Sequence, residues 1–140
     1  MDQIAGKAVD LGAWPESIAT TTLFVEDLEA AKQFYRKVFG LSVVFEDQDS
    51  TVFKFGPMLI NLLKTTAAGE LIAPAKVGSR GAGSRFVFTI HVDDVDSMCA
   101  ELTARGVKLL NGPMDRPWGV RTASFMDPGG HVWEIAKAQS

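Results

Sequence analysis

The sequence contains one cysteine, Cys99, in 140 residues. Because a disulfide needs two cysteines, none can form within the chain, and one thiol cannot assemble a cysteine-based metal cluster. Such sparse use of cysteine is typical of proteins in a reducing compartment, so we expect a cytoplasmic protein.

Long apolar runs and an excess of positive charge are also lacking. The longest stretches without a charged residue, 17–25 and 55–63, are nine residues each, whereas a membrane-spanning helix needs about 20. Residues 1–16 carry scattered charges and no apolar core of the kind that a secretory signal needs. The net charge is −3 and the basic residues are spread along the chain, so there is no field to attract a phosphate backbone. We expect neither a membrane nor a nucleic acid as partner.

What is present favours one globular domain over residues 1–140. The hydrophobic fraction of 46% and the charged fraction of 22% are those of folded proteins rather than disordered ones. A chain of this length suits a single hydrophobic core.

An internal repeat organises the chain. The segment that begins at Val25-Glu26-Asp27-Leu28-Glu29 ends at Gly40-Leu41, and the one that begins at Val92-Asp93-Asp94-Val95-Asp96 ends at Gly106-Val107. Each copy predicts a strand, an amphipathic helix and three further strands. We therefore predict an α+β fold of two tandem βαβββ modules, about 17–64 and 85–137, with the helices on the outer face of a curved mixed sheet around a cleft. The alanine- and glycine-rich residues 65–84 between the modules are predicted to be a linker or a mobile flap.

The two predicted helices share their start signals and their apolar spacing. Asp27 and Asp94 are the predicted N-caps, and Gly40 and Gly106 the predicted stops. Side chains at spacings of three and four should face the core: Leu28, Ala31, Phe34, Tyr35 and Val38 in the first helix, and Val95, Met98, Cys99 and Leu102 in the second. Cys99 is therefore interpreted as a core residue.

Strand alternation leaves a second, mixed set of side chains on the face away from the helices. A face that combines aromatic and polar groups is typical of a ligand pocket. The candidate cleft residues are Thr20, Thr22, Phe24, Asn61, Thr89, His91, Arg121 and Glu134, with Trp118 at the edge and the linker as a lid. The charge of Glu134 needs compensation by water, by a basic side chain such as Arg121, or by a cationic ligand. His131 falls in the helix-side register and is interpreted as structural.

The paired modules and two sequence stretches resemble the vicinal oxygen chelate superfamily, which includes glyoxalase I, extradiol dioxygenases and bleomycin-resistance proteins. The stretches are Leu23-Phe24-Val25-Glu26-Asp27 before the first helix, and Phe125-Met126-Asp127-Pro128-Gly129-Gly130-His131-Val132-Trp133-Glu134. Catalytic members of that superfamily hold a divalent metal with one residue from each of four inner strands. The resemblance places these four positions at Thr20, Asn61, Val87 and Glu134, of which only Glu134 matches. Threonine and asparagine are poor ligands for a transition metal and valine is none.

These residues leave three functional hypotheses open. The first is a metal-independent binding protein that sequesters an aromatic or drug-like compound, without a cofactor, and closest in character to the metal-free bleomycin-resistance members. The second is a metal-dependent lyase, isomerase or dioxygenase with a non-standard site for one divalent ion around Glu134 and His91. The third is a cofactor-free enzyme that uses Glu134 or His91 as general base. Members of the superfamily usually form dimers, so the resemblance also implies a homodimer.

Overall fold

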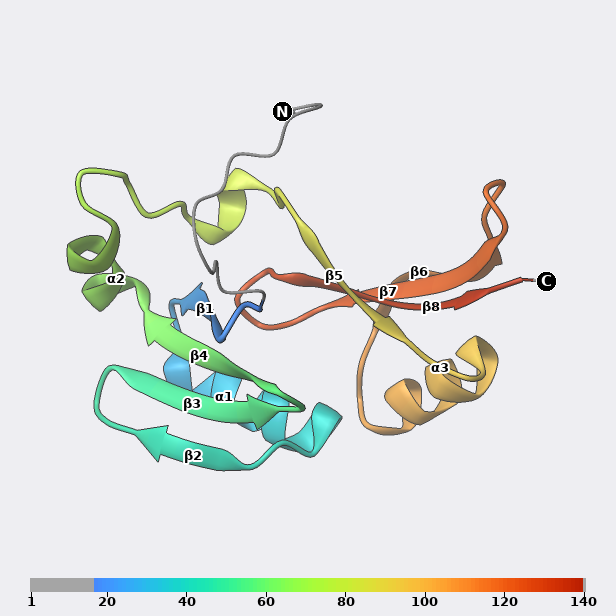
Figure 1. The fold of residues 1–140 in the computed structure, drawn as a ribbon, viewed down its shortest axis with the longest axis horizontal. Helices are drawn as coiled ribbons and strands as arrows, with labels where there is room; N and C mark the ends of the chain where they lie inside the picture. Colours follow the sequence, from blue (N-terminus) through green and yellow to red (C-terminus); the bar gives the residue numbers. More distant parts are fainter. Residues whose placement is uncertain (1–16, 140) are drawn as a thin grey trace, which may run out of the picture.

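The computed structural model describes residues 17–139 and contains two four-stranded sheets (Figure 1). The first module contains β1 (Thr20–Val25), α1 (Leu28–Phe39), β2 (Val43–Glu46), β3 (Ser50–Phe55) and β4 (Met58–Lys64). The second contains β5 (Val87–His91), α3 (Val95–Ala104), β6 (Leu109–Asp115), β7 (Val120–Met126) and β8 (Val132–Ala138). The segment 1–16, on which the expectation about a secretory signal rests, lies outside the described residues. Among the residues described, no helix has the length and apolar character that crossing a membrane requires.

The two sheets have the same topology. Their strand orders are β1-β4-β3-β2 and β5-β8-β7-β6, in which the first pair is parallel and the others are antiparallel. Thr22 is paired with Asn61 in the first sheet, and Thr89 with Glu134 in the second. The predicted α+β class with tandem βαβββ modules is confirmed, and each module forms its own mixed sheet.

Both main helices begin where the sequence predicts. The carboxylate of Asp27 accepts a hydrogen bond from the Ala30 N–H at 3.0 Å, and that of Asp94 accepts one from the Ser97 N–H at 3.0 Å. Each bond satisfies one of the amide groups that the first helical turn leaves unpaired. The first helix ends at Phe39, and its C-cap, Gly40, adopts the left-handed conformation with φ of 66°.

The helices lie on the outer faces of the sheets, and the apolar side chains beneath them form one core. Trp133 of β8 lies at its centre, with ring centroids 5.0 Å from Phe39 of α1 and 5.8 Å from Phe55 of β3. Phe88 of β5 lies 4.7 Å from the same ring. Since Phe39 and Phe55 come from the first module, the aromatic contacts join the two modules.

The segment between the modules contains more regular structure than expected. Residues Thr65–Ile72 form the helix α2, and Arg80–Ala82 form a single 3-10 turn, η1. Alanine has the highest helix propensity, and Ala68 of α2 is fully buried. The sequence did not predict this helix because Lys64, at its start, offers no side-chain cap and the segment has few large apolar residues.

Candidate functional site

The inner face of the first sheet carries an amide group with an open hydrogen-bonding position. Asn61 Nδ2 donates to Thr22 Oγ1 at 3.4 Å. Asn61 Oδ1 is buried and has no hydrogen-bond partner among residues 17–139. Phe24, half-buried, and Thr20, exposed, lie on the same face of β1. A buried acceptor without a donor is costly, so a hydrogen-bond donor that reached Asn61 Oδ1 would stabilise this face.

The inner face of the second sheet holds the candidate carboxylate. Thr89 Oγ1 donates to Glu134 Oε1 at 2.9 Å. His91 follows on the same face of β5 and is exposed, and Val87 precedes Thr89 with 49% of its surface exposed. The hydroxyl of Thr89 therefore supplies part of the compensation that the charge of Glu134 was expected to need.

Arg121 does not take the position expected for it beside Glu134. Its guanidinium donates to both carboxylate oxygens of Asp96 on α3, at 2.8 and 2.9 Å, and to Asp115 Oδ1 at 2.9 Å. These bonds raise the pKa of Arg121 and lower that of Asp96. Arg121 thus lies on the α3 side of the sheet, because the adjacent residue Thr122 occupies the inner face.

Trp118 lies in the turn between β6 and β7 and is 69% exposed. Its ring centroid is 5.9 Å from the guanidinium carbon of Arg116. Arg116 in turn donates to Thr122 Oγ1 at 2.8 Å and to Asn111 Oδ1 at 3.0 Å. Sequence reasoning missed Arg116, since it lies outside the alternating part of the strands.

A cavity of about 330 Å³ lies where β1, the end of the linker and the β7–β8 turn meet. Thr22 and Phe24 line it together with residues of the segments 78–86 and 129–132. Asn61, Thr89, His91, Trp118 and Glu134 are not among its lining residues. Only the last residues of the linker therefore contribute to the cavity. They cover the inner face of the first sheet at β1, and the rest of the linker does not act as the predicted lid over the cavity.

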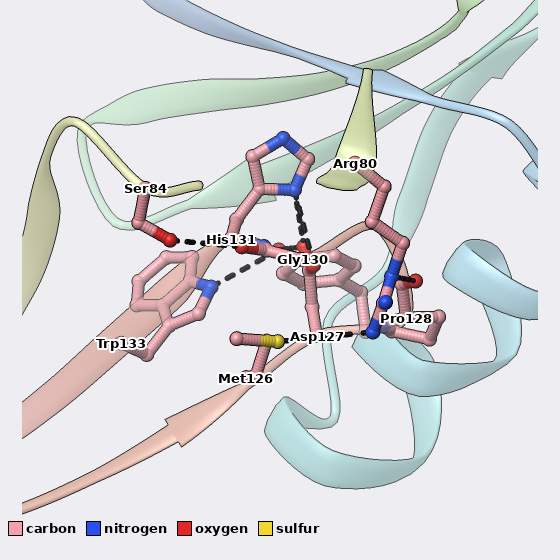
Figure 2. A network of polar contacts seen from close by, with 9 residues as sticks. Arg80, Ser84, Met126, Asp127, Pro128, Gly130, His131 and Trp133 are labelled. Carbon is pink, nitrogen blue, oxygen red and sulfur yellow. Dashed lines mark hydrogen bonds and ion pairs between the residues drawn. The ribbon is translucent and has the colours of Figure 1, made fainter. Parts of the chain in front are cut away.

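A buried polar network lies beside this cavity and was not predicted from the sequence (Figure 2). Asp127, 2% exposed, accepts hydrogen bonds from the Tyr35 hydroxyl and from the His131 main-chain N–H, the latter at 2.8 Å. The His131 ring Nδ1 lies 2.9 Å from Asp127 Oδ2, and Trp133 Nε1 donates to the Tyr35 hydroxyl at 3.1 Å. Burial and the adjacent Asp127 raise the pKa of Tyr35 well above its ordinary value, so this hydroxyl stays protonated and remains a donor.

The four positions that the superfamily uses for a metal do not fit one here. Val87 has no ligating atom, Thr20 and Asn61 offer only neutral oxygens, and one oxygen of Glu134 already accepts the Thr89 hydrogen bond. Among the residues described, no group of three or more histidine, cysteine, aspartate or glutamate side chains is arranged to hold a metal ion.

Cys99 supplies no reactive group to the site. The side chain is 6% exposed, and burial raises the pKa of its thiol. The interpretation of Cys99 as a core residue of α3 is confirmed.

Comparisons with known proteins identify the family of this chain. The family model of the Glyoxalase/Bleomycin resistance protein/Dioxygenase superfamily matches residues 17–135. The uncharacterized protein YraH of Bacillus subtilis (strain 168) is 33% identical over 119 residues, which cover 82% of this chain and 93% of YraH. A solved glyoxalase/bleomycin resistance protein/dioxygenase from Nocardioides shares the fold with a TM-score of 0.83 and 21% identity, over 93% of this chain and 88% of that one. Lactoylglutathione lyase from Agrobacterium tumefaciens has a TM-score of 0.69 and 29% identity, over 87% of this chain and 93% of the other. The chain therefore belongs to the Glyoxalase/Bleomycin resistance protein/Dioxygenase superfamily.

Proposed function

We propose that this protein binds a small aromatic or drug-like molecule without a metal and acts by sequestering it. The observation that carries the proposal is the set of side chains at the four family metal positions, three of which are Thr20, Asn61 and Val87. They keep a binding face but remove the ligands that a transition metal needs. The fourth position, Glu134, is engaged with Thr89.

The inner face of the first sheet supplies the recognition chemistry of this proposal. Phe24 offers an aromatic ring to a flat molecule, and Asn61 Oδ1 offers a buried acceptor to its N–H or O–H group. A ligand that fills this position removes the cost of an unpaired acceptor, which is about 1–3 kcal/mol. The expected ligand is therefore flat and carries at least one hydrogen-bond donor.

Titration calorimetry with bleomycin and with a panel of planar aromatic amines and phenols tests this proposal. At least one compound should bind to the unmodified protein and be recovered chemically unchanged by mass spectrometry. Asn61→Leu should weaken that binding about tenfold or more, because it removes the acceptor without changing the side-chain size much. Thr103→Val, on the exposed side of α3, is the matched control and should leave the affinity unchanged.

Conversion of the bound compound to product would contradict sequestration. Equal affinities of the unmodified protein and Asn61→Leu would remove the inner face of the first sheet from the proposal.

A second candidate function, a metal-dependent lyase, isomerase or dioxygenase, is favoured by the 29% identity with the lactoylglutathione lyase of Agrobacterium tumefaciens. In this case Glu134 and His91 would contribute to a displaced metal site. Elemental analysis of the purified protein, followed by melting scans with Ni²⁺, Mn²⁺, Fe²⁺, Co²⁺ and Zn²⁺, distinguishes the two functions. A metal enzyme should contain stoichiometric metal, and the metal should raise its melting temperature, since binding to the folded state raises stability; Glu134→Gln should abolish that rise. A sequestering protein should show neither the metal nor a rise that depends on Glu134.

We further propose that the working form is a cytoplasmic homodimer. Val87 and Trp118 expose 49% and 69% of their surfaces, and large exposed apolar groups near a binding face favour a partner surface. A second copy of the chain would cover the inner faces and complete the site. Because the contacts of a two-fold dimer are the same for both copies, such a dimer would contain two equivalent sites. The single cysteine supports the cytoplasmic location.

A further inference from the structure

The contacts of His131 fix the orientation of its imidazole ring. Asp127 lies 2.9 and 3.0 Å from Nδ1 through its two oxygens, and the Tyr35 hydroxyl and the His131 N–H also donate to this carboxylate. A carboxylate surrounded by donors acts only as an acceptor, so the ring proton resides on Nδ1. In the neutral ring Nε2 then carries a free lone pair.

The two glycines of the turn make room for this arrangement. A Cβ on Gly129 would lie 2.9 Å from His131 Cε1, and a Cβ on Gly130 would lie 2.9 Å from Arg80 Cγ. Gly130 also adopts a φ of 92°, which other residues rarely adopt. The turn therefore allows the imidazole and the arginine stem to pack directly against its backbone.

The imidazole ring of His131 is partly exposed at the cavity. The ring lines that cavity, 14% of the side chain is exposed, and Nε2 points away from Asp127 (Figure 2). Within residues 17–139, Nδ1 is the only ring nitrogen of His131 with a hydrogen-bond partner. An imidazole whose orientation is held by Asp127 thus lines the same space as Thr22 and Phe24.

The remaining lining residues indicate what would enter. Arg80 and Arg85 bring two positive charges and Glu26 one negative charge, which leaves an excess of positive charge. The Arg80 side chain is held by a hydrogen bond from Nε to the Pro128 carbonyl at 2.9 Å. Phe86 adds a second aromatic ring, with its centroid 6.3 Å from that of His131.

We propose that this cavity binds a small aromatic acid that carries a hydroxyl group, and that His131 Nε2 accepts the hydrogen bond of the hydroxyl. The carboxylate of the ligand pairs with Arg80 or Arg85, and its ring lies between Phe24 and Phe86. Asp127 is a positioning residue that keeps the proton on Nδ1. This inference rests on the proposed function, since Thr22 and Phe24 belong both to the cavity and to the inner face of the first sheet.

The test compares 4-hydroxybenzoate with benzoate, which lacks the hydroxyl, by titration calorimetry. The unmodified protein should bind 4-hydroxybenzoate about tenfold more tightly than benzoate, the ratio expected for one good hydrogen bond. In His131→Asn the ratio should fall to about one, because the asparagine amide preserves the donor to Asp127 but has no counterpart of Nε2. Thr103→Val, on the exposed side of α3, is the control and should keep the tenfold ratio. The double variant Arg80→Gln/Arg85→Gln should lower the affinity for both compounds by a similar factor.

Nitrogen-15 NMR of the two imidazoles gives a second readout, which is measured on the unmodified protein and therefore does not require that a variant folds. His131 should show the Nδ1-protonated form in the unliganded protein, and its Nε2 resonance, not that of His91, should shift with 4-hydroxybenzoate. Asp127→Asn should alter the ratio of the two neutral tautomers of His131, with the proton on Nδ1 or on Nε2. A purely structural role of Asp127 would leave that ratio unchanged.

A ratio of one in the unmodified protein, or an unshifted Nε2 resonance at saturating concentration, would overturn the inference. If an aromatic amine or phenol binds in an Asn61-dependent manner while 4-hydroxybenzoate does not depend on His131, the proposed function stands and this inference alone fails. If neither variant affects any binding, both fail.

Discussion

The side chain of Asp127 connects residues that are far apart in the sequence. Tyr35 lies on α1 and His131 at the start of β8, and both reach the same carboxylate. Trp133 extends the network by donating to the Tyr35 hydroxyl. Because all of these groups are buried or nearly so, the loss of any one partner leaves another polar group unsatisfied.

The Tyr35 hydroxyl should remain protonated until the protein unfolds. Its pKa is raised in the folded state by burial and by Asp127, whereas in the unfolded chain it is about 10. The stability that depends on this proton is complete below pH about 10 and is lost as the pH rises further, because the unfolded state then releases the proton and the folded state does not. Since Tyr35 is the only tyrosine, the increase in absorbance at 295 nm that tyrosinate causes comes from this residue alone. After subtraction of the tryptophan contribution, it should appear only together with cooperative unfolding.

The control for this prediction is Tyr35→Phe, monitored by circular dichroism. It should be less stable at pH 7, by about 1–3 kcal/mol, because Asp127 and the Trp133 N–H lose their partner. Its stability should also fall less steeply above pH 10. A tyrosinate signal that develops with an ordinary pKa in the folded protein would contradict the prediction.

Local sequence patterns identified part of the site and missed the rest for a physical reason. Alternation along the strands placed Thr22 and Asn61 on one face, and Thr89 and Glu134 on another, and the strand pairings agree with this. It could not find the bond between Tyr35 and Asp127, which are 92 residues apart, because such a bond depends on how the two modules pack.

At the scale of the elements, β6 depends on one glycine. The pairing of β6 with β7 shifts register on both sides of Asn111, and Gly112 follows with a φ of 87°. A Cβ at this position would lie 2.5 Å from the Thr122 carbonyl oxygen and 2.6 Å from Ala123 Cα. Both obstacles are main-chain atoms of the central part of β7, so they have little freedom to move.

Gly112→Ala should therefore destabilise the protein by about 2–4 kcal/mol, from backbone strain and steric overlap combined. Gly119→Ala is a matched control, because Gly119 also has a φ of 87° but a Cβ at that position would meet no atom within 4 Å. The control should lose only about 1–2 kcal/mol, the cost of the left-handed conformation. Urea unfolding measures both, and equal losses would show that the overlap at β7 is relieved by local movement.

The helices differ in how well the sequence predicted them. Asp27 and Asp94 identified the starts of α1 and α3, because a capping carboxylate and an apolar stripe occur together there. The helix α2 has neither signal, and its buried residue is the small Ala68. Its packing on β1 and β4 depends on tertiary contacts that the local sequence does not specify.

At the scale of the whole molecule, the proposed homodimer predicts a mass in solution of twice the 15.1 kDa of one chain. Sedimentation velocity measures it over a range of concentrations. Val87→Lys should raise the dissociation constant at least about tenfold, because a charge would be buried at the interface without a partner. Ala104→Lys, on the outer helix α3, is the control and should leave the dimer intact. A monomer at all concentrations would contradict the proposal.

The shared aromatic core has a consequence for folding. The two sheets have no strand in common, yet Trp133 packs against Phe39 and Phe55, and Tyr35 donates to Asp127. Each half of the chain thus leaves apolar and polar groups uncovered when the other half is absent. The repeat that makes the halves look like independent units in the sequence therefore does not make them independent in folding: the molecule should denature in a single step, and neither half, produced as a separate fragment, should fold alone.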